Sequence, residues 1–417
     1  MLTKMATTTR LAQMLTQARA DTDALFDLVR PEALYERPVP ERHRLIFYFG
    51  HLEAFDWNLI GQPSAGSSFS PEFDQLFAFG IDPKPGQNQQ DERSDWPEIA
   101  EVQDYNRRVR QTLDDVFNQT SEQLLSIALE HRLMHAETFA YLLHSLSLDQ
   151  KHVPPKHVPL LAPLPQSTAP IQAMLEIPGG TVTLGQSRKD ASGRDQFGWD
   201  NEFESLEVSV ASFAMNKYKV TNGEYLQFVR AGAKPPHFWK WHEGQWYWRG
   251  MWEDIPLPLD WPVYATHEEA SAFAAWAGKR LPTEAEFHRA AYGTVHGEEA
   301  RAYPWGGEQR DSRRGNFGGN RWDPISVTAT PLGDSAFGVS QLVGNGWEWT
   351  STAFQPFPGF QTFSCYPGYS ARFFDGDHYV LKGASPRTDA RLLRRSFRNW
   401  FRPNFPYVYA GFRCVEV

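Results

Sequence analysis

The feature that most constrains the fold is a proline-rich break well before the midpoint of the chain. Residues 148–173 repeat the pattern Lys-His-Val-Pro at 151–154 and 156–159 and then continue with further prolines. Proline removes a backbone donor and favours an extended conformation, so this segment predicts a semi-rigid linker. We therefore expect two folded regions, residues 1–147 and 174–417, which also suits a chain of 417 residues.

The first region has the periodicity of a helical bundle. Apolar residues recur at helical spacing in four stretches. Four such helices joined by short or moderate links are typical of a four-helix bundle. Thr120 and Gln123 form a capping-box pattern at the start of the last stretch. The expected helices span residues 8–29, 41–60, 102–117 and 120–146.

Two histidines on the last of these helices point to a metal site. His131 and His135 are one helical turn apart on the apolar face, and His51 lies on the apolar stripe of the second helix. Three buried imidazoles would cost about 1–3 kcal/mol for each unsatisfied group, which favours a shared metal over ordinary core histidines. Imidazoles without cysteine suit Fe(II), Zn(II) or Cu(II). Glu137 lies on another face of the helix, so we expect it to have a supporting or structural role.

Composition and charge narrow the class of protein. The net charge of −9 argues against a nucleic-acid surface. No apolar stretch of about 18 residues is present to span a bilayer, and the N-terminus lacks a signal-peptide core, so we expect a cytoplasmic protein without a membrane partner. The high aromatic content indicates aromatic-lined pockets. Cys365 and Cys414 are the only cysteines, which excludes a disulfide scaffold.

The second region changes to short strands, frequent glycine and tryptophan, and long irregular segments. We expect a compact α+β domain with helices at 221–231, 268–278 and 283–292. Six ordered motifs resemble the formylglycine-generating-enzyme (sulfatase-modifying-factor) fold, a loop-rich fold that also serves lectin-like proteins. They are Ile177–Gly180, Tyr218–Asn222, Arg280–Phe287, Tyr303–Gly306, Gly344–Trp349 and Gly411–Arg413.

Most residues in these motifs are expected to be structural. Trp347 and Trp349 are predicted to lie in the core, and Thr283 to cap a helix. The oxygen-activating formylglycine enzymes use a close cysteine pair near the C-terminus. Cys365 and Cys414 lie far apart in the sequence, so we do not expect that chemistry here.

The combination of regions resembles the nonheme-iron sulfoxide synthases of ergothioneine and ovothiol biosynthesis, in which a DinB-like four-helix bundle precedes such a domain. The resemblance covers nearly the whole chain. It implies that His51, His131 and His135 bind Fe(II) and leave positions open for O2 and a sulfur or selenium donor. It also implies that residues 174–417 form the pocket for hercynine (N-α-trimethylhistidine). A structural Ca2+ in the C-terminal domain is left open.

Two aromatic segments are similar to substrate segments of this family. Residues 366–374 match a Y-x-x-Y-S-x-x-F-F pattern, which implies that Tyr366 donates a proton or hydrogen, with Tyr369 the next candidate. Phe397–Trp400 matches an F-R-N-W pattern, which implies that Asn399 and Trp400 hold the trimethylammonium group. A tryptophan face attracts a quaternary cation. An ordinary aromatic loop is the alternative for the first segment.

The chain departs from the family pattern at two positions. Met134 stands where members commonly have a glutamine before a ligand histidine. Phe401 stands where members that use γ-glutamylcysteine have an aspartate for the donor's ammonium. A sugar has no ammonium to satisfy, so the resemblance favours the selenosugar donor of the selenoneine synthases. Arg398 or Arg402 would then be free to contact it.

Three alternatives stay open. The first is a hercynine sulfoxide synthase that uses γ-glutamylcysteine or cysteine. The second is a non-catalytic member that uses the C-terminal fold for binding, against which the three histidines and Tyr366 argue. The third is a DinB-type thiol transferase that uses Zn(II), which leaves Tyr366, Asn399 and Trp400 without a role.

Overall fold

The chain folds into two compact units, Met1–Val158 and Pro159–Val417. The structure is a computed structural model that describes residues 2–65, 68–78, 91–154, 168–298, 301–307 and 309–416. Within these ranges, no helix is both long enough and apolar enough to cross a membrane.

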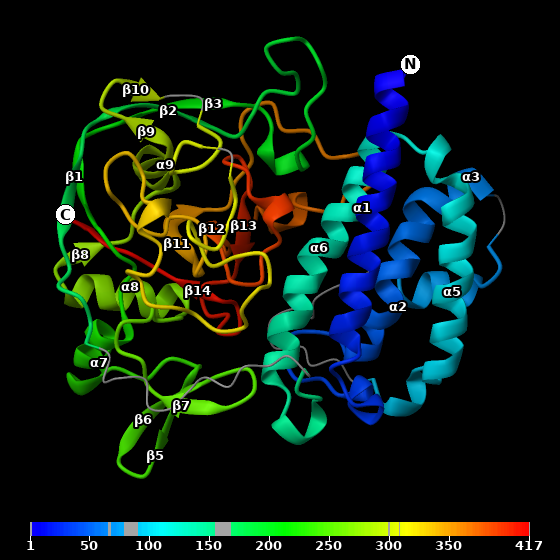
Figure 1. The fold of residues 1–417 in the computed structure, drawn as a ribbon, viewed down its shortest axis with the longest axis horizontal. Coiled ribbons are helices and arrows are strands. Elements are labelled where there is room, and N and C mark those ends of the chain that lie inside the picture. The colour runs from blue at the N-terminus through cyan, green and yellow to red at the C-terminus, as the bar shows by residue number, and fades with distance from the viewer. Residues whose placement is uncertain are drawn as a thin grey trace. The chain divides into compact units, whose positions relative to one another are not determined.

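Unit 1 is a helical bundle, as the sequence predicted (Figure 1). A π-helical turn, Trp57–Gly61, extends the second long helix. Short helices α3 (Gln62–Ala65) and α4 (Pro71–Leu76) follow it, and 3-10 turns at Pro31–Tyr35, Arg93–Asp95, Phe117–Gln119 and Leu148–Gln150 complete the described secondary structure. The long helices are α1 (Leu2–Phe26), α2 (Leu45–Asp56), α5 (Ile99–Val116) and α6 (Glu122–Ser145).

The start of α6 differs from the predicted capping box. The cap is Ser121, whose Oγ accepts a hydrogen bond from the backbone N–H of Leu124 at 3.3 Å. The hydroxyl of Thr120 instead donates to the carbonyl of Val116 at 3.0 Å. The prediction that Thr120 and Gln123 form the box is wrong, because the preceding turn already uses the Thr120 hydroxyl.

The predicted linker at 148–173 begins with structured residues. Leu148–Gln150 forms a 3-10 turn, and Lys151 pairs with Val29 in an isolated β-bridge within unit 1. Residues 155–167, which make up half of the expected extended segment, lie outside the described ranges. The bundle therefore extends at least to Lys151.

Unit 2 combines short strands in small sheets with the helices α7 (Asn222–Arg230), α8 (His267–Trp276) and α9 (Glu284–Tyr292). The predicted helices are therefore present. One sheet has the order β1-β4-β15-β8, formed by Met174–Ile177, Phe213–Asn216, Val415–Glu416 and Lys279–Arg280. Another has the order β13-β12-β11-β14, formed by Asn399–Phe401, Tyr379–Ala384, Gly346–Ala353 and Ala410–Gly411.

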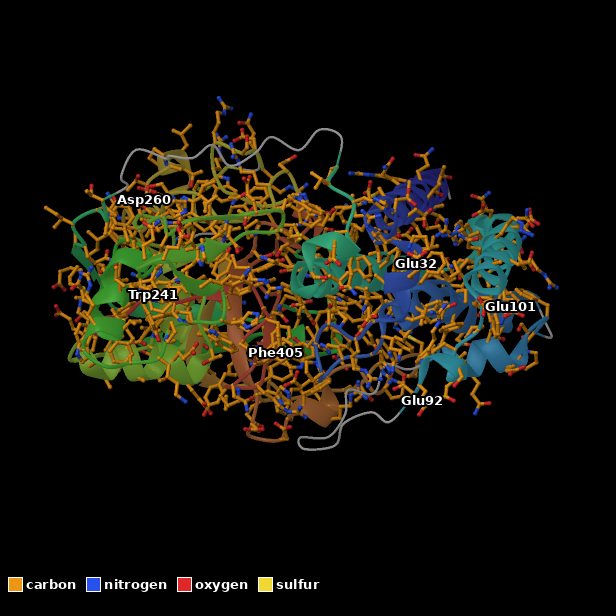
Figure 2. The ribbon with its side chains drawn as sticks, turned by 90° about the horizontal axis from the view of Figure 1, so that it is seen from below. Glu32, Glu92, Glu101, Trp241, Asp260 and Phe405 are labelled. Carbon is orange, nitrogen blue, oxygen red and sulfur yellow. The ribbon has the colours of Figure 1, made fainter. Side chains whose placement is uncertain are left out.

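Three smaller sheets complete the described strands of unit 2. They are β2 with β3 (Gly180–Leu184, Leu206–Val210), β5-β6-β7 (Trp239–His242, Gln245–Arg249, Asp254–Pro256) and β9 with β10 (Gly293–Thr294, Gly297–Glu298). Trp241 on β5, labelled in Figure 2, is 60% exposed. Short 3-10 turns lie at Asp200–Glu202, Pro331–Gly333, Ala371–Phe373 and Ala390–Leu392.

Each helix of unit 2 starts with a capping box. The threonine side chain before the helix accepts a hydrogen bond from the N–H three residues on, and a glutamate there reaches back to the threonine N–H. This confirms Thr283 as the N-cap of α9. The pairs are Thr221 with Glu224, Thr266 with Glu269 and Thr283 with Glu286.

A buried carboxylate ties the ends of unit 2 to its central sheet. Glu348 on β11 is fully buried and accepts hydrogen bonds from Arg413 at 2.6 and 2.8 Å and from Lys219 at 2.8 Å. Burial raises its pKa, but the two cations have the larger combined effect and keep that pKa below its usual value. Trp347 and Trp349 flank it in the core, as predicted.

Candidate functional site

The three predicted histidines meet inside unit 1. His131 and His135 lie one turn apart on α6, with ring centroids 4.4 Å apart. His51 on α2 faces both, with centroid distances of 5.2 Å to His131 and 4.9 Å to His135. One ring nitrogen from each lies within 4.8 Å of the other two. The bundle therefore brings His51 together with a histidine pair that lies about eighty residues further along the chain.

A backbone carbonyl orients His51. Its Nδ1 lies 2.6 Å from the carbonyl oxygen of Phe77, so Nδ1 carries the proton and donates it. The lone pair is then on Nε2, the nitrogen that is left to bind a metal. Phe77 follows α4 and is fully buried. Sequence reasoning missed this contact, because a carbonyl oxygen has no residue signature.

Aromatic rings hold the imidazoles from the side. Phe55 stacks on His131 with a centroid distance of 3.5 Å and an interplanar angle of 9°. Phe47 stacks on His51 at 4.8 Å and 21°. Phe47, His51 and Phe55 follow one another at i, i+4 and i+8 on α2, so one helix face supplies both a ligand and its packing.

Burial keeps all three imidazoles neutral. It is the largest cause of the lowered pKa of His51, which falls to about 4, and it places the pKa values of His131 and His135 well below the usual range. Neighbouring imidazoles and the Arg132 guanidinium add to the effect on His131. Neutral imidazole is the form that binds a metal. The three side chains are thus in the ligating state at neutral pH.

The donor set fits a transition metal. Within the described residues, these three histidines form the one group of three or more His, Cys, Asp or Glu side chains close enough to share an ion. No carboxylate cluster among the described residues supports the structural Ca2+ that the sequence left open. Glu137 is buried but is not a member of the group. His135 Nδ1 is buried with no hydrogen-bond partner among the described residues, as a ligand nitrogen awaiting a metal would be.

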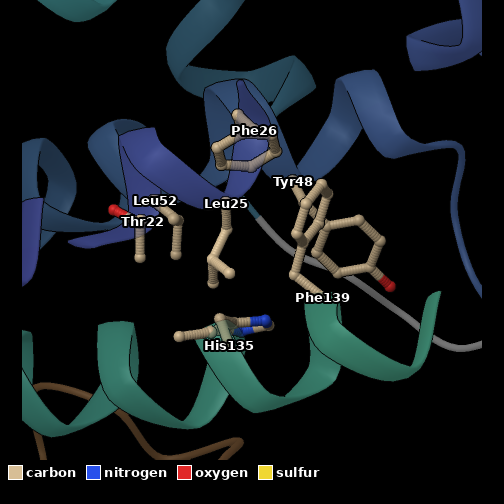
Figure 3. Close-up of a pocket in the computed structure, with 8 residues that line it drawn as sticks. Thr22, Leu25, Phe26, Tyr48, Leu52, His135 and Phe139 are labelled. Atoms are coloured by element: carbon tan, nitrogen blue, oxygen red, sulfur yellow. The ribbon is translucent and has the colours of Figure 1, made fainter. Parts of the chain in front are cut away.

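An apolar pocket lies beside His135 (Figure 3). It has no room for a water molecule. Thr22 and Tyr48 are the lining residues that carry a hydroxyl, and the hydroxyl of Thr22 donates to the carbonyls of Ala18 and Arg19 within α1. The imidazole of His135 is therefore flanked by a dry surface. The lining residues are Thr22, Leu25, Phe26, Tyr48, Leu52, His135, Ala136 and Phe139.

A buried ion network joins the two ligand helices. Arg132, next to His131 on α6, contacts Glu53 and Asp56 on α2, each at 2.9 Å. All three side chains are 1% exposed. Burial opposes ionisation of Glu53, yet Arg132, Arg110 and Arg19 lower its pKa to about 2. Arg110 on α5 also bonds to Asp23 on α1, so the network reaches all the long helices.

The candidate substrate residues lie in an aromatic cluster of unit 2. Tyr366 and Tyr369 lie on the loop between β11 and β12, and Trp400 lies on β13, which pairs with β12. Trp400 stacks on Phe354 at 4.3 Å and 7° and meets Tyr369 edge-on at 5.4 Å. We define the aromatic cluster as Trp199, Phe354, Tyr366, Tyr369, Phe373 and Trp400.

Two other candidates lie on the same strand as Trp400. Asn399 pairs with Leu381, and its Oδ1 accepts a hydrogen bond from the N–H of Trp400 at 2.9 Å. Phe401 pairs with Tyr379 and stacks on Phe405 at 5.1 Å and 15°. The segment thus has an aromatic side chain, Phe401, at the position where family members that use γ-glutamylcysteine have an aspartate.

One predicted contact residue is engaged elsewhere. Arg398 is 3% exposed, and its guanidinium lies 3.1 Å from Glu284 and donates to the carbonyls of Asn201 and Gln355. The expectation that Arg398 is free to meet a donor is wrong, because its charge is used inside unit 2. Arg402 is partly exposed, and Met134 is partly exposed on α6 beside His135.

We predict that His135→Ala abolishes binding of a divalent metal. The variant removes one of three converging nitrogens, and two imidazoles hold a first-row metal much more weakly. Anaerobic titration with Co(II) or Fe(II), followed by absorption and by metal analysis, measures the loss. His144→Ala is the control, because His144 is also buried on α6 but lies outside the group. Stoichiometric metal in His135→Ala would contradict the assignment.

We predict that Arg132→Met lowers the free energy of unfolding of unit 1 by about 3–5 kcal/mol, because it removes the closest counter-ion of the buried Asp56 and one of the three guanidinium groups around the buried Glu53. Denaturant unfolding of the metal-free protein measures this change. Arg107→Met is the control, because the Arg107–Asp104 pair is exposed and contributes less than about 1 kcal/mol. Equal losses in the two variants would rule out a stabilising role for the buried network.

Comparison with known proteins places the chain in a family. Residues 14–152 match the DinB superfamily, and residues 161–417 match the sulfatase-modifying factor enzyme 1-like domain. A hercynine oxygenase of Mycolicibacterium smegmatis is 31% identical over 442 residues, 97% of this chain and 98% of that protein.

A second hercynine oxygenase, from Mycobacterium tuberculosis, is 38% identical over 238 residues, which cover 52% of this chain and about half (55%) of the relative. The solved structure of PvdO from Pseudomonas aeruginosa covers 58% of this chain and 94% of its own, with 22% identity and a TM-score of 0.42. The family-model matches and the full-length relative agree on both domains and their order. This chain therefore belongs to the hercynine oxygenase family, the sulfoxide synthases of ergothioneine biosynthesis.

Proposed function

We propose that this chain is a nonheme Fe(II)- and O2-dependent enzyme that joins selenium or sulfur to the imidazole C2 carbon of hercynine. The observation that carries the proposal is the convergence of three neutral imidazoles within 4.8 Å in a chain of this family. Replacing the C2–H bond by a bond to a chalcogen is an oxidation, and O2 accepts the electrons. Iron bound at the site would supply the redox chemistry and the open positions for O2 and the donor.

The aromatic cluster supports hercynine as the acceptor substrate. A trimethylammonium group has no N–H to donate and is recognised by aromatic faces. The ring centroids of Tyr369 and Phe373 lie 5.4 and 5.5 Å from that of Trp400, and Trp400 is partly exposed. Phe354 covers one face of the indole and holds its orientation. We assign Asn399 and Trp400 to the head group of the betaine.

Tyr366 is proposed as the proton or hydrogen donor. Burial raises the pKa of its phenol to about 12, so the hydroxyl stays protonated at neutral pH. A protonated phenol is competent to donate. Its neighbour Tyr369, with ring centroids 5.6 Å away, is the next candidate.

The donor is proposed to be a selenosugar. Phe401 stacks on Phe405 and offers no carboxylate for the ammonium of γ-glutamylcysteine. A sugar needs no such partner. The second candidate is a hercynine sulfoxide synthase that uses γ-glutamylcysteine or cysteine. The name of the relatives, hercynine oxygenase, supports hercynine as the acceptor and names no donor.

A single assay tests the proposed function. Protein loaded anaerobically with Fe(II) is mixed with hercynine, O2 and one donor at a time: selenosugar, γ-glutamylcysteine or cysteine. Mass spectrometry identifies a product in which hercynine has gained the chalcogen at C2, and 2-deuterated hercynine must lose its label. No coupled product with any donor would overturn the proposal.

We predict that Trp400→Ala weakens hercynine binding by about 1–2 kcal/mol, the range for a desolvated cation–π contact. Histidine, which lacks the three methyl groups, should lose less affinity. Calorimetry with both ligands measures the difference. Trp241→Ala, an exposed tryptophan on β5, is the control. Equal losses for hercynine and histidine would place the ammonium site elsewhere.

We predict that Phe401→Asp improves the use of γ-glutamylcysteine relative to selenosugar by roughly ten- to a hundredfold, because a charged partner for an ammonium is worth about 1.5–3 kcal/mol. The ratio of kcat/KM values for the two donors measures the change. Phe401→Asn is the control, because an asparagine side chain has the shape of aspartate but lacks its charge. A wild-type preference for γ-glutamylcysteine would contradict the selenosugar assignment.

A further inference from the structure

One short turn of unit 2 contacts both candidate substrate segments. It consists of Trp199 and the 3-10 turn Asp200–Glu202, and we call it the Trp199–Glu202 turn. All four side chains are at most 1% exposed. Glu202 closes the turn by accepting a hydrogen bond from the N–H of Trp199 at 2.8 Å. The turn lies far in sequence from both segments, and no motif had pointed to it.

One side of the turn holds the loop that carries Tyr366. Ser370, fully buried, donates its hydroxyl to Asp200 Oδ1 at 2.5 Å. The indole of Trp199 stacks on Tyr369 at 4.0 Å and 24° and meets Tyr366 edge-on at 6.4 Å. The backbone N–H of Tyr366 donates to the carbonyl of Phe363 and that of Tyr369 to the carbonyl of Tyr366, so successive turns link the two tyrosines.

The other side of the turn holds the segment before Trp400. Glu202 accepts a hydrogen bond from Arg394 Nε at 2.7 Å and from Ser396 Oγ at 2.6 Å. Arg398 donates to the carbonyl of Asn201 at 3.3 Å. These three residues lead directly into Asn399 and Trp400, so the turn is bonded to both segments.

We infer that Asp200 and Glu202 are positioning residues, which fix the phenol of Tyr366 relative to Trp400. This inference rests on the proposed function, because it takes Tyr366 and Trp400 as the working residues. Asp200 acts through Ser370 on the tyrosine loop, and Glu202 acts through Arg394 and Ser396 on the strand. Neither carboxylate needs to touch a substrate.

The chemistry of the turn suits this role better than a general stabilising one. Burying a carboxylate is costly, and burial raises the pKa of Asp200 to about 6 even though Ser370 and backbone N–H groups, including that of Phe363, favour the ionised form. An apolar residue would fill the space at lower cost. Unlike an apolar residue, a carboxylate accepts short, directional hydrogen bonds, which fix the orientation of each donor side chain.

The test deletes the Ser370 hydroxyl and follows the fate of O2. Ser370→Ala removes the bond to Asp200 without adding volume, and Ser192→Ala is the matched control, because Ser192 donates to Asp190 at 2.6 Å on an exposed loop. Iron-loaded protein is given hercynine and donor, and the ratio of coupled product to oxidised donor is measured. We expect this ratio to fall about tenfold in Ser370→Ala, as the loss of one charge-assisted bond allows, and to stay unchanged in Ser192→Ala.

A double-variant cycle separates positioning from general damage. If Asp200 and Ser370 act through Tyr366, Ser370→Ala has no further effect on the ratio in a Tyr366→Phe background. The same tenfold fall in both backgrounds would overturn the inference. Asp200→Asn, which keeps the shape but removes the charge, provides a second variant and is expected to follow Ser370→Ala.

A readout without turnover keeps the inference testable if the proposed function fails. Fluorotyrosine at position 366 gives one 19F NMR resonance for a single loop conformation in the full-length protein. We expect Ser370→Ala and Asp200→Asn to broaden or split this resonance and Ser192→Ala to leave it unchanged. An unaltered resonance in both variants overturns the inference. A wild-type protein without coupled product in the assay overturns the proposed function alone.

Discussion

The candidate metal site depends on one buried guanidinium. Arg132 sits next to His131 on α6 and holds the two carboxylates of α2 that follow His51 by two and five residues. Hydrophobic packing specifies the register of two helices less strictly than three buried charged groups, whose 2.9 Å contacts are lost when one helix shifts along the other. That register decides whether the nitrogens of His51, His131 and His135 come within 4.8 Å of one another.

In unit 2, buried ion pairs and hydrogen bonds likewise hold the candidate substrate residues in place. Its candidate residues lie on a loop and on a three-residue strand, elements too short to fix their own side chains. Buried carboxylates compensate: Glu348 binds the C-terminal Arg413 to β11, and the Trp199–Glu202 turn binds the tyrosine loop and the strand. In both units, buried charged residues with no proposed part in the reaction hold the candidate site residues in place.

The sequence predicted what local spacing or a motif encodes. The i, i+4 pair of His131 and His135 is visible as a pattern, and the cap of α9 at Thr283 follows from its motif. The carbonyl of Phe77 and the partners of Arg132 were not predictable, because they depend on which distant residues meet, with Glu53 being 79 positions away. The prediction for Arg398 was wrong for the same reason, since its partner Glu284 lies on α9, far away in the sequence.

The charge balance of the metal site bears on the donor. Three neutral imidazoles bring no negative charge to a divalent cation. The buried carboxylates on α2, Glu53 and Asp56, are already paired with Arg132 and are not members of the histidine group. A metal in this site would therefore keep its full charge and favour an anionic ligand. A selenolate or a thiolate meets that demand, whereas an alcohol or a thioether does not, which fits a donor that binds through a deprotonated chalcogen.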